Sequence, residues 1–79
     1  MKLKILTPSG SVVDGIEVSA VFLPGTLGEF EVLPDHAPII SSLERGDIRW
    51  REDGQEKGTS INSGFVTVRD NVVEACVEI

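Results

Sequence analysis

Seventy-nine residues are enough for one domain and too few for two independent hydrophobic cores. The chain has 13 acidic and 7 basic residues, and its net charge of −6 argues against binding to nucleic acid or directly to anionic lipid, because both need a basic surface. A single cysteine excludes an internal disulfide, and one cysteine with one histidine gives no zinc site. The N-terminus lacks the apolar core of a signal peptide, and no run approaches the roughly 20 apolar residues of a membrane span, so we expect a soluble, intracellular protein.

The hydrophobic pattern has a period of two residues rather than 3.6, which predicts β-strands. The first strand covers Lys2–Ile5 and ends at the turn residues Pro8–Gly10. A short return strand, Val12–Val13, is expected to stop at Asp14–Gly15. A longer strand then runs from Ile16 to Leu23.

This longer strand alternates between two faces. One face carries Ile16, Val18, Ala20 and Phe22, and the other carries Glu17, Ser19, Val21 and Leu23. The second face becomes apolar toward the end of the strand, so we expect part of it to be covered as well.

Two later turns predict β-hairpins, because Asp53–Gly54 and Asp70–Asn71 both tolerate the positive φ angles of a type I′ turn. The flanking strands are Ile48–Glu52 with Gln55–Lys57, and Phe65–Arg69 with Val72–Val77. Turn residues recur about every 8 to 12 positions, which is typical of an all-β sandwich or barrel. The best helix candidate, Ser41–Gly46, is too short to form one.

The chain offers little for catalysis. His36 is the only histidine, and a nucleophilic mechanism would need Cys76 or a serine beside it. Cys76 lies in the predicted last strand between apolar neighbours, so we expect a packed thiol. Glu29 and Glu31 share one strand face, which is more often an exposed acidic face than a catalytic pair. No glycine pattern matches a phosphate-binding loop, and the sequence predicts no active site.

The aromatic residues and the prolines divide between core and surface. Pro34 and Pro38 stiffen the loop around His36, because a residue that precedes proline is held extended. We favour His36 as an exposed contact on this stiff loop over a purely structural role. Trp50 is favoured as a core residue on size alone. The phenylalanines are core candidates on the same ground: Phe22, Phe30 and Phe65.

Several motifs in a fixed order resemble one family. They are Gly28–Phe30, the loop Leu33–Pro38, Gly46–Ile48 and Gly64–Phe65, preceded by Leu3–Thr7 as an opening strand. Together they resemble the N-terminal β-sandwich domain of the ε subunit of F-type ATP synthases, named δ in mitochondria. The resemblance implies an all-β fold, a flattened β-sandwich of about ten short antiparallel strands, with residues 1–79 forming a single domain.

The resemblance also implies a function. It is that of a non-catalytic rotor subunit in the central stalk, without a cofactor, that links the γ subunit to the c-ring and couples proton flow to ATP synthesis. The implied c-ring contacts are Gly28, Glu29, Phe30, Pro34, Asp35, His36, Ala37 and Pro38, and the implied γ contacts are Thr7, Ser41 and Ser42. The subunit would be peripheral, on the cytoplasmic face of the bacterial inner membrane or on the energy-coupling membrane of an organelle.

Two departures from the family pattern stand out. Asp35 replaces a usual glycine, and we expect aspartate to tolerate any positive φ there. Family members usually continue into two helices that regulate ATP hydrolysis and in some cases bind ATP. This sequence ends at Ile79, as an excised domain or a naturally short form, so we expect no C-terminal helical hairpin and carry over neither of those functions.

Two other classes of function remain open at this stage. A free-standing β-sandwich module that binds a protein or a ligand would need an aromatic-lined groove, but the chain has only three phenylalanines, one tryptophan and no tyrosine. A small hydrolase built on His36 and Cys76 would need a thiol that alkylating reagents can reach.

Overall fold

The computed structural model describes all 79 residues, which form nine β-strands and no helix. The strands are β1 (Lys2–Thr7), β2 (Gly10–Glu17), β3 (Ala20–Gly25), β4 (Gly28–Val32), β5 (Ile39–Leu43), β6 (Gly46–Glu52), β7 (Gln55–Ile61), β8 (Ser63–Arg69) and β9 (Val72–Glu78). The all-β prediction is confirmed, with nine strands rather than about ten. Nothing in the structure qualifies as a helix of the length and apolarity needed to span a membrane.

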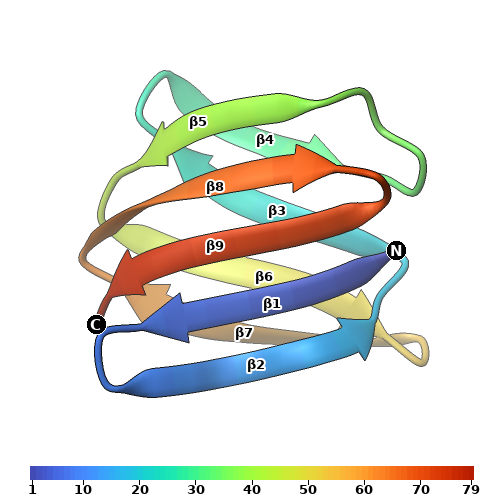
Figure 1. Cartoon of the computed structure of the whole chain (residues 1–79), viewed down its shortest axis with the longest axis horizontal. Helices are drawn as coiled ribbons and strands as arrows, with labels where there is room; N and C mark the ends of the chain where they lie inside the picture. Colours follow the sequence, from blue (N-terminus) through green and yellow to red (C-terminus); the bar gives the residue numbers. More distant parts are fainter.

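The strands form two facing layers (Figure 1). The hydrogen-bonded order is β2-β1-β9-β8-β5-β3-β6-β7, and β4 pairs with β3. In Figure 1, β2, β1, β9, β8 and β5 make the nearer layer, and β4, β3, β6 and β7 make the farther one. Only one residue pair, Gly25 with Leu43, joins β3 to β5, so the sheet folds over at that point. All pairings are antiparallel except β1 with β9, which is parallel.

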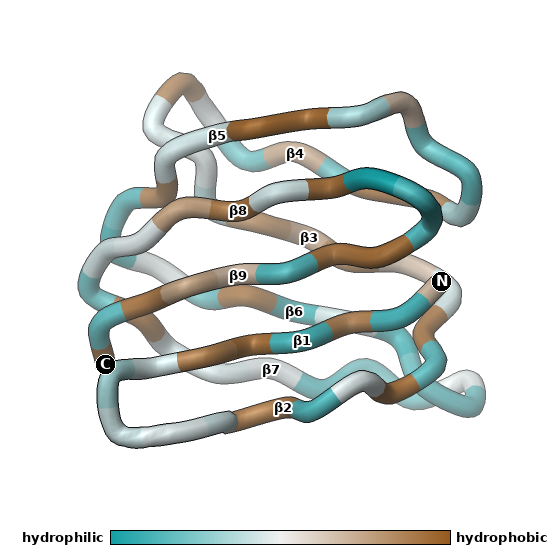
Figure 2. The backbone as a smooth tube through the Cα atoms, viewed as in Figure 1, coloured by the Kyte–Doolittle hydropathy of each residue, from teal (hydrophilic) through white to brown (hydrophobic).

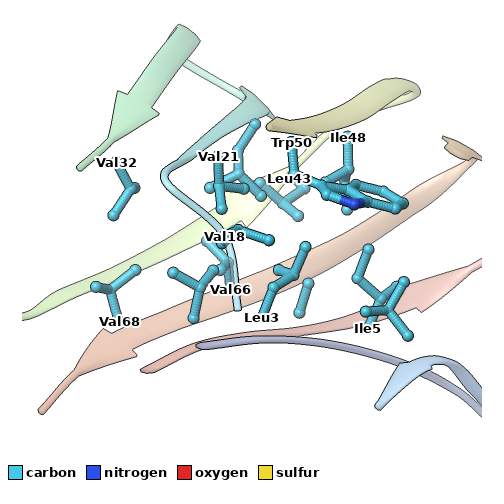
Figure 3. Close-up of a cluster of buried hydrophobic side chains, with 14 of the residues drawn as sticks. Leu3, Ile5, Val18, Val21, Val32, Leu43, Ile48, Trp50, Val66 and Val68 are labelled. Atoms are coloured by element: carbon cyan, nitrogen blue, oxygen red, sulfur yellow. The ribbon is translucent and has the colours of Figure 1, made fainter. Parts of the chain in front are cut away.

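Alternate side chains from both layers meet between them and form one core. Leu3, Ile5, Val66 and Val68 from the nearer layer face Val21, Val32, Ile48 and Trp50 from the farther one (Figure 3). The cluster contains 17 buried hydrophobic residues, and no polar or charged residue is buried. Figure 2 shows the same alternation as changes from apolar to polar colour along the strands. Stability therefore rests on apolar burial and the backbone ladder rather than on buried ion pairs.

The predicted long strand from Ile16 to Leu23 is wrong. β2 continues through Asp14–Gly15, and its pairing with β1 shifts register there, as at a β-bulge. The chain then turns at Val18–Ser19, whose N–H groups donate to the carbonyls of Met1 and Arg51. The alternating pattern therefore spans two strands in different layers, and the corner between them resets its phase.

The phase change reverses the predicted faces of the second half of that segment. In β3, Val21 and Leu23 are fully buried, whereas Phe22 points outward and is half-buried. The Arg49 guanidinium lies over the Phe22 ring, 4.8 Å from its centroid, in a cation–π contact. The expectation that part of the second face would be covered is confirmed, but Phe22 is not a core residue.

Both predicted hairpins are confirmed. Asp53 and Gly54 have φ angles of 52° and 76°, and Asp70 and Asn71 have 53° and 63°. Positive φ at both central residues is the signature of the type I′ turn. The segment Ser41–Gly46 contains the end of β5 and the turn into β6 rather than a helix.

Of the other core predictions, that for Trp50 is confirmed by its 6% exposure, whereas those for Phe65 and Cys76 fail on strand phase. Phe65 is 52% exposed, because Val66 and Val68 take the inward positions of β8. Phe30 takes the inward phase of β4, like the buried Val32, and its half-buried ring packs against the margin of the core. Cys76 is only half-buried, since its neighbours in β9 occupy the inward positions. A period of two shows that a strand has two faces but does not decide which is inward when both carry apolar side chains.

Candidate functional site

Eight residues with an implied c-ring role lie along one edge of the sandwich. This edge is formed by β4, the loop Leu33–Pro38 and β5, with β4 in the farther layer and β5 in the nearer one (Figure 1). We call it the edge surface. A cavity of about 480 Å³ lies between the two strands, and its lining includes Gly28, Glu29, Phe30 and His36. The structure therefore brings half of the predicted set together around one hollow.

The other four predicted residues lie farther along the same edge. Pro34, Asp35, Ala37 and Pro38 belong to the loop that ends β4 and begins β5, at the end of the sandwich where the β8–β9 turn also lies (Figure 1). The Leu33 carbonyl accepts a hydrogen bond from the His36 N–H at 3.2 Å. The set is therefore a strip along one edge rather than a cluster at one end.

The geometry of this loop is that of a type II turn. Pro34 occupies the second position, and Asp35 occupies the third with φ 63°. The expectation that Asp35 tolerates positive φ is confirmed. His36 Nδ1 lies 2.8 Å from the Ala37 carbonyl oxygen, and because a carbonyl only accepts, Nδ1–H is the donor. The imidazole is thus oriented by its own loop, with Nε2 left for another partner.

Glu29 is not a free carboxylate. Its Oε1 lies 3.1 Å from Nη2 of Arg49, and Glu56 Oε1 lies 3.4 Å from Nη1 of the same guanidinium. The hydrogen bond to Glu29 is the main reason that the pKa of Arg49 is raised. Sequence reasoning missed Arg49, because only the pairing of β3 with β4 on one side and with β6 on the other, within the farther layer, brings Arg49 near Glu29. The negative charge of Glu29 is therefore partly neutralised by Arg49.

Two exposed apolar residues at the edge surface were also missed. Leu27, at the tip of the β3–β4 turn, is 103% exposed, and Ile40 of β5 is 84% exposed. Both contribute to the lining of the edge cavity. Isolated exposed apolar residues are common, but two beside one cavity are a feature of interaction surfaces. The only sequence signal for this apolar surface was Leu27 itself, because leucine is unusual in a tight turn.

A second surface lies on the outer face of the nearer layer. A groove of about 550 Å³ there is lined by Leu6, Thr7, Pro8, Phe65 and Cys76, among others. The strand register places Leu6 beside Cys76, Cys76 beside Phe65, and Phe65 beside Ser42. We call this the outer groove. Its exposed phenylalanine is the kind of side chain that anchors protein interfaces.

The implied γ contacts divide between the two surfaces. Thr7 lines the outer groove, and its Oγ1 donates to the Gly10 carbonyl at 2.9 Å, which also closes the β1–β2 turn. Ser42 faces outward beside Phe65 at the end of the outer groove, and its hydroxyl shares a 2.8 Å hydrogen bond with that of Thr26. Ser41 takes the opposite phase of β5 and lines the edge cavity. Ser42 pairs with Phe65 and is absent from the lining of the edge cavity, so these two serines do not share one surface.

His36 and Cys76 line different cavities, so the structure does not bring them together as a base and a nucleophile. No group of three or more histidine, cysteine, aspartate or glutamate residues is placed to hold a metal ion. The fold and its surfaces thus define a class: a β-sandwich domain with exposed, partly apolar contact surfaces.

The comparisons give the family. Residues 1–79 match the model of the β-sandwich domain of the ATP synthase delta/epsilon chain, and the chain belongs to this family. It is 41% identical over 78 residues to the ATP synthase epsilon chain of Trichlorobacter lovleyi, and this alignment covers 99% of this chain and 56% of that one. It is 44% identical over 79 residues to the ATP synthase epsilon chain of a Sulfurovum species, covering 99% and 61%. The chain thus spans little more than half the length of these relatives.

Solved structures share the fold. The central stalk and c-ring structure of the Tetrahymena thermophila mitochondrial ATP synthase contains a chain that superposes with a TM-score of 0.86 at 16% identity, over 100% of this chain and 63% of that one. A chain in a c-ring-containing structure of the Euglena gracilis mitochondrial ATP synthase gives a TM-score of 0.89 at 23% identity, over 95% and 48%. At these identities the likeness establishes the sandwich architecture alone.

Proposed function

We propose that residues 1–79 act as one domain of a non-catalytic central-stalk subunit of a proton-translocating F-type ATP synthase. In this role the domain links the γ subunit to the c-ring, turns with them, and helps couple proton flow to ATP synthesis. It is a peripheral part of the complex, on the cytoplasmic face of a bacterial inner membrane. The family match over the whole chain and the bacterial relatives named as epsilon chains support the assignment.

One structural observation carries the proposal: the chain keeps large apolar side chains in water on two surfaces that share β5. Phe65 is 52% exposed in the outer groove, and Ile40 is 84% exposed on the edge surface. A domain of this size has a small core, and the exposed part of the ring adds nothing to the stability of the isolated domain. A partner that covers these side chains recovers their burial free energy.

We assign the outer groove to γ. Phe65 supplies an aromatic anchor, while Thr7 and Ser42 provide hydroxyl groups along the outer groove. Hot spots of this kind are typically aromatic residues within a rim of polar contacts. The proposed γ contacts are accordingly Thr7, Ser42 and Phe65, with Ser41 at the border between the two surfaces.

We assign the edge surface to the polar loops of the c-ring. Its loop is stiff, because Pro34 and the type II turn fix the backbone and the Nδ1–H bond fixes His36. A rigid loop loses little conformational entropy when it docks. Glu29 and His36 offer hydrogen-bonding groups, and Leu27 and Ile40 offer apolar area.

The double variant Glu29→Ala with His36→Ala tests the assignment to the c-ring. We expect it to fold and to bind γ as the parent chain does, while losing assembly on the c-ring. Glu56→Ala is the matched control, because it removes the other carboxylate on Arg49 from a strand outside the edge surface. A complex that carries the double variant and still assembles and synthesises ATP normally would refute this part of the proposal.

A further inference from the structure

The β8–β9 turn is bonded to two other parts of the chain through a single residue. The Asn71 carbonyl accepts the Lys2 N–H at 3.0 Å, which ties the turn to β1. The side-chain Oδ1 of Asn71 accepts the Asp35 N–H at 2.9 Å, which ties the turn to the Leu33–Pro38 loop 36 residues away. Figure 1 shows this turn and this loop at the same end of the sandwich.

The bond to Asp35 falls on the one strained residue of the loop. In the type II turn, the hydrogen bond that closes the turn uses the His36 N–H, so the Asp35 N–H has no partner within the turn itself. Asp35 has φ 63°, a conformation that favours glycine and costs free energy for other residues. An acceptor fixed in front of its N–H favours this conformation over the extended alternatives.

The chain contains an internal comparison for Asn71. In the other type I′ hairpin, the second central residue is Gly54, with φ 76°, and glycine is sufficient there to form the turn. Asn71 takes the same position with φ 63° and adds a side-chain acceptor that glycine lacks. The hairpin alone therefore does not require the asparagine, whereas the bond to Asp35 does.

We propose that Asn71 is a positioning residue for the edge surface: its Oδ1 holds Asp35 at positive φ and so fixes the direction in which His36 is presented to the c-ring. This inference rests on the proposed function, and it adds a residue that lies outside the contact strip. The β8–β9 turn thereby helps to set the conformation of the edge surface.

Asn71→Gly is the direct test, because it keeps the type I′ turn and removes only the acceptor. By NMR of the 79-residue chain, we expect the Asp35 amide to exchange about fivefold faster, as the loss of one exposed hydrogen bond allows. We expect binding to the c-ring to weaken by a similar factor and binding to γ to remain unchanged. Asp70→Gly is the matched control, since it removes the neighbouring side chain of the same turn, which makes no bond to the loop.

A second variant separates loop geometry from simple destabilisation. Adding Asp35→Gly to Asn71→Gly supplies a residue that adopts positive φ without help, and we expect it to recover c-ring binding. Unchanged Asp35 exchange in Asn71→Gly would overturn the proposal. Faster exchange with full c-ring binding would also overturn it, while the proposed function stands if the Glu29 and His36 double variant loses binding. If that double variant also binds fully, the assignment of the edge surface to the c-ring itself fails.

Discussion

Replacing Phe65 by alanine tests whether the ring belongs to the core or to a partner. Its position after Gly64 in a strand of alternating apolar residues favours a core role, and a buried phenylalanine replaced by alanine costs about 3 to 5 kcal/mol. The structure instead places the ring in the outer groove at 52% exposure. The two interpretations therefore differ by several kcal/mol in a single variant.

The expected magnitude follows from the exposed fraction. Full burial of a large apolar side chain stabilises by about 1.5 to 3 kcal/mol, and a ring that is 52% exposed gains roughly half of this. Removing it at the surface leaves no closed cavity. We therefore expect Phe65→Ala to lower the free energy of unfolding by about 1 kcal/mol. A domain of this size tolerates that loss and remains folded.

Val66→Ala is the matched control in the same strand. Val66 is 0% exposed, and its substitution removes two carbon atoms, at about 0.8 kcal/mol each, and adds a cavity term, so we expect a loss of about 2 to 3 kcal/mol. Urea unfolding of the two variants gives the comparison. The smaller side chain should thus be the more costly one to truncate. A loss of 3 kcal/mol or more for Phe65→Ala would refute the placement of the ring.

Binding to γ gives the second readout of the same variant. An aromatic anchor truncated to alanine typically costs about 2 kcal/mol of binding free energy, or roughly a 30-fold rise in Kd. Because the Val66 side chain does not reach the surface, Val66→Ala should leave the affinity of the folded protein for γ unchanged. If Phe65→Ala binds γ as tightly as the parent chain, the outer groove is not the γ site.

Three further predictions concern stability and accessibility. Gly64→Ala should destabilise by about 1 to 3 kcal/mol in urea, because a Cβ there would lie 2.5 Å from the backbone carbonyl oxygen of Cys76; a neutral variant would contradict that close approach. The N-terminal ammonium lies 3.1 Å from Oε2 of Glu17 and holds the pKa of that carboxyl below its usual value. The ion pair therefore stabilises the fold above the unfolded-state pKa of about 4.3. This stabilisation is lost as the pH falls through the lower pKa of the folded state. Glu17→Gln should accordingly be less stable than the parent at neutral pH and match it near pH 2, and a difference that is constant with pH would count against the pair. Native Cys76 should react with iodoacetamide and be protected by bound γ, whereas reaction only after unfolding would place the thiol in the core.

Local chemistry made the turns predictable. Asp53–Gly54 and Asp70–Asn71 are pairs that tolerate positive φ, so each specifies its hairpin without help from the rest of the chain. The ordered motifs from Gly28 to Phe65 likewise led to the family that the whole chain matches. Both signals depend on residues close together in sequence, or on a known order, and neither requires knowledge of packing.

The remaining features depend on contacts between distant strands. The corner at Val18–Ser19 resets the strand phase and turns Phe22 outward, although the sequence pattern continues through it without a break. The inward phase of β8 depends on which face meets the other layer, so Phe65 could not be assigned from its own strand. The pairing of Glu29 with Arg49, like the bond from Asp35 to Asn71, exists only because the fold brings remote segments together.

The most direct test of the proposed role is capture of the tagged 79-residue chain by purified γ subunit, followed by addition of the c-ring. The proposal predicts a stable complex with γ that then retains the c-ring, with γ binding sensitive to Phe65→Ala and c-ring retention sensitive to the Glu29 and His36 double variant. A folded chain that binds neither partner would contradict the rotor assignment and would favour a free-standing β-sandwich binding module instead.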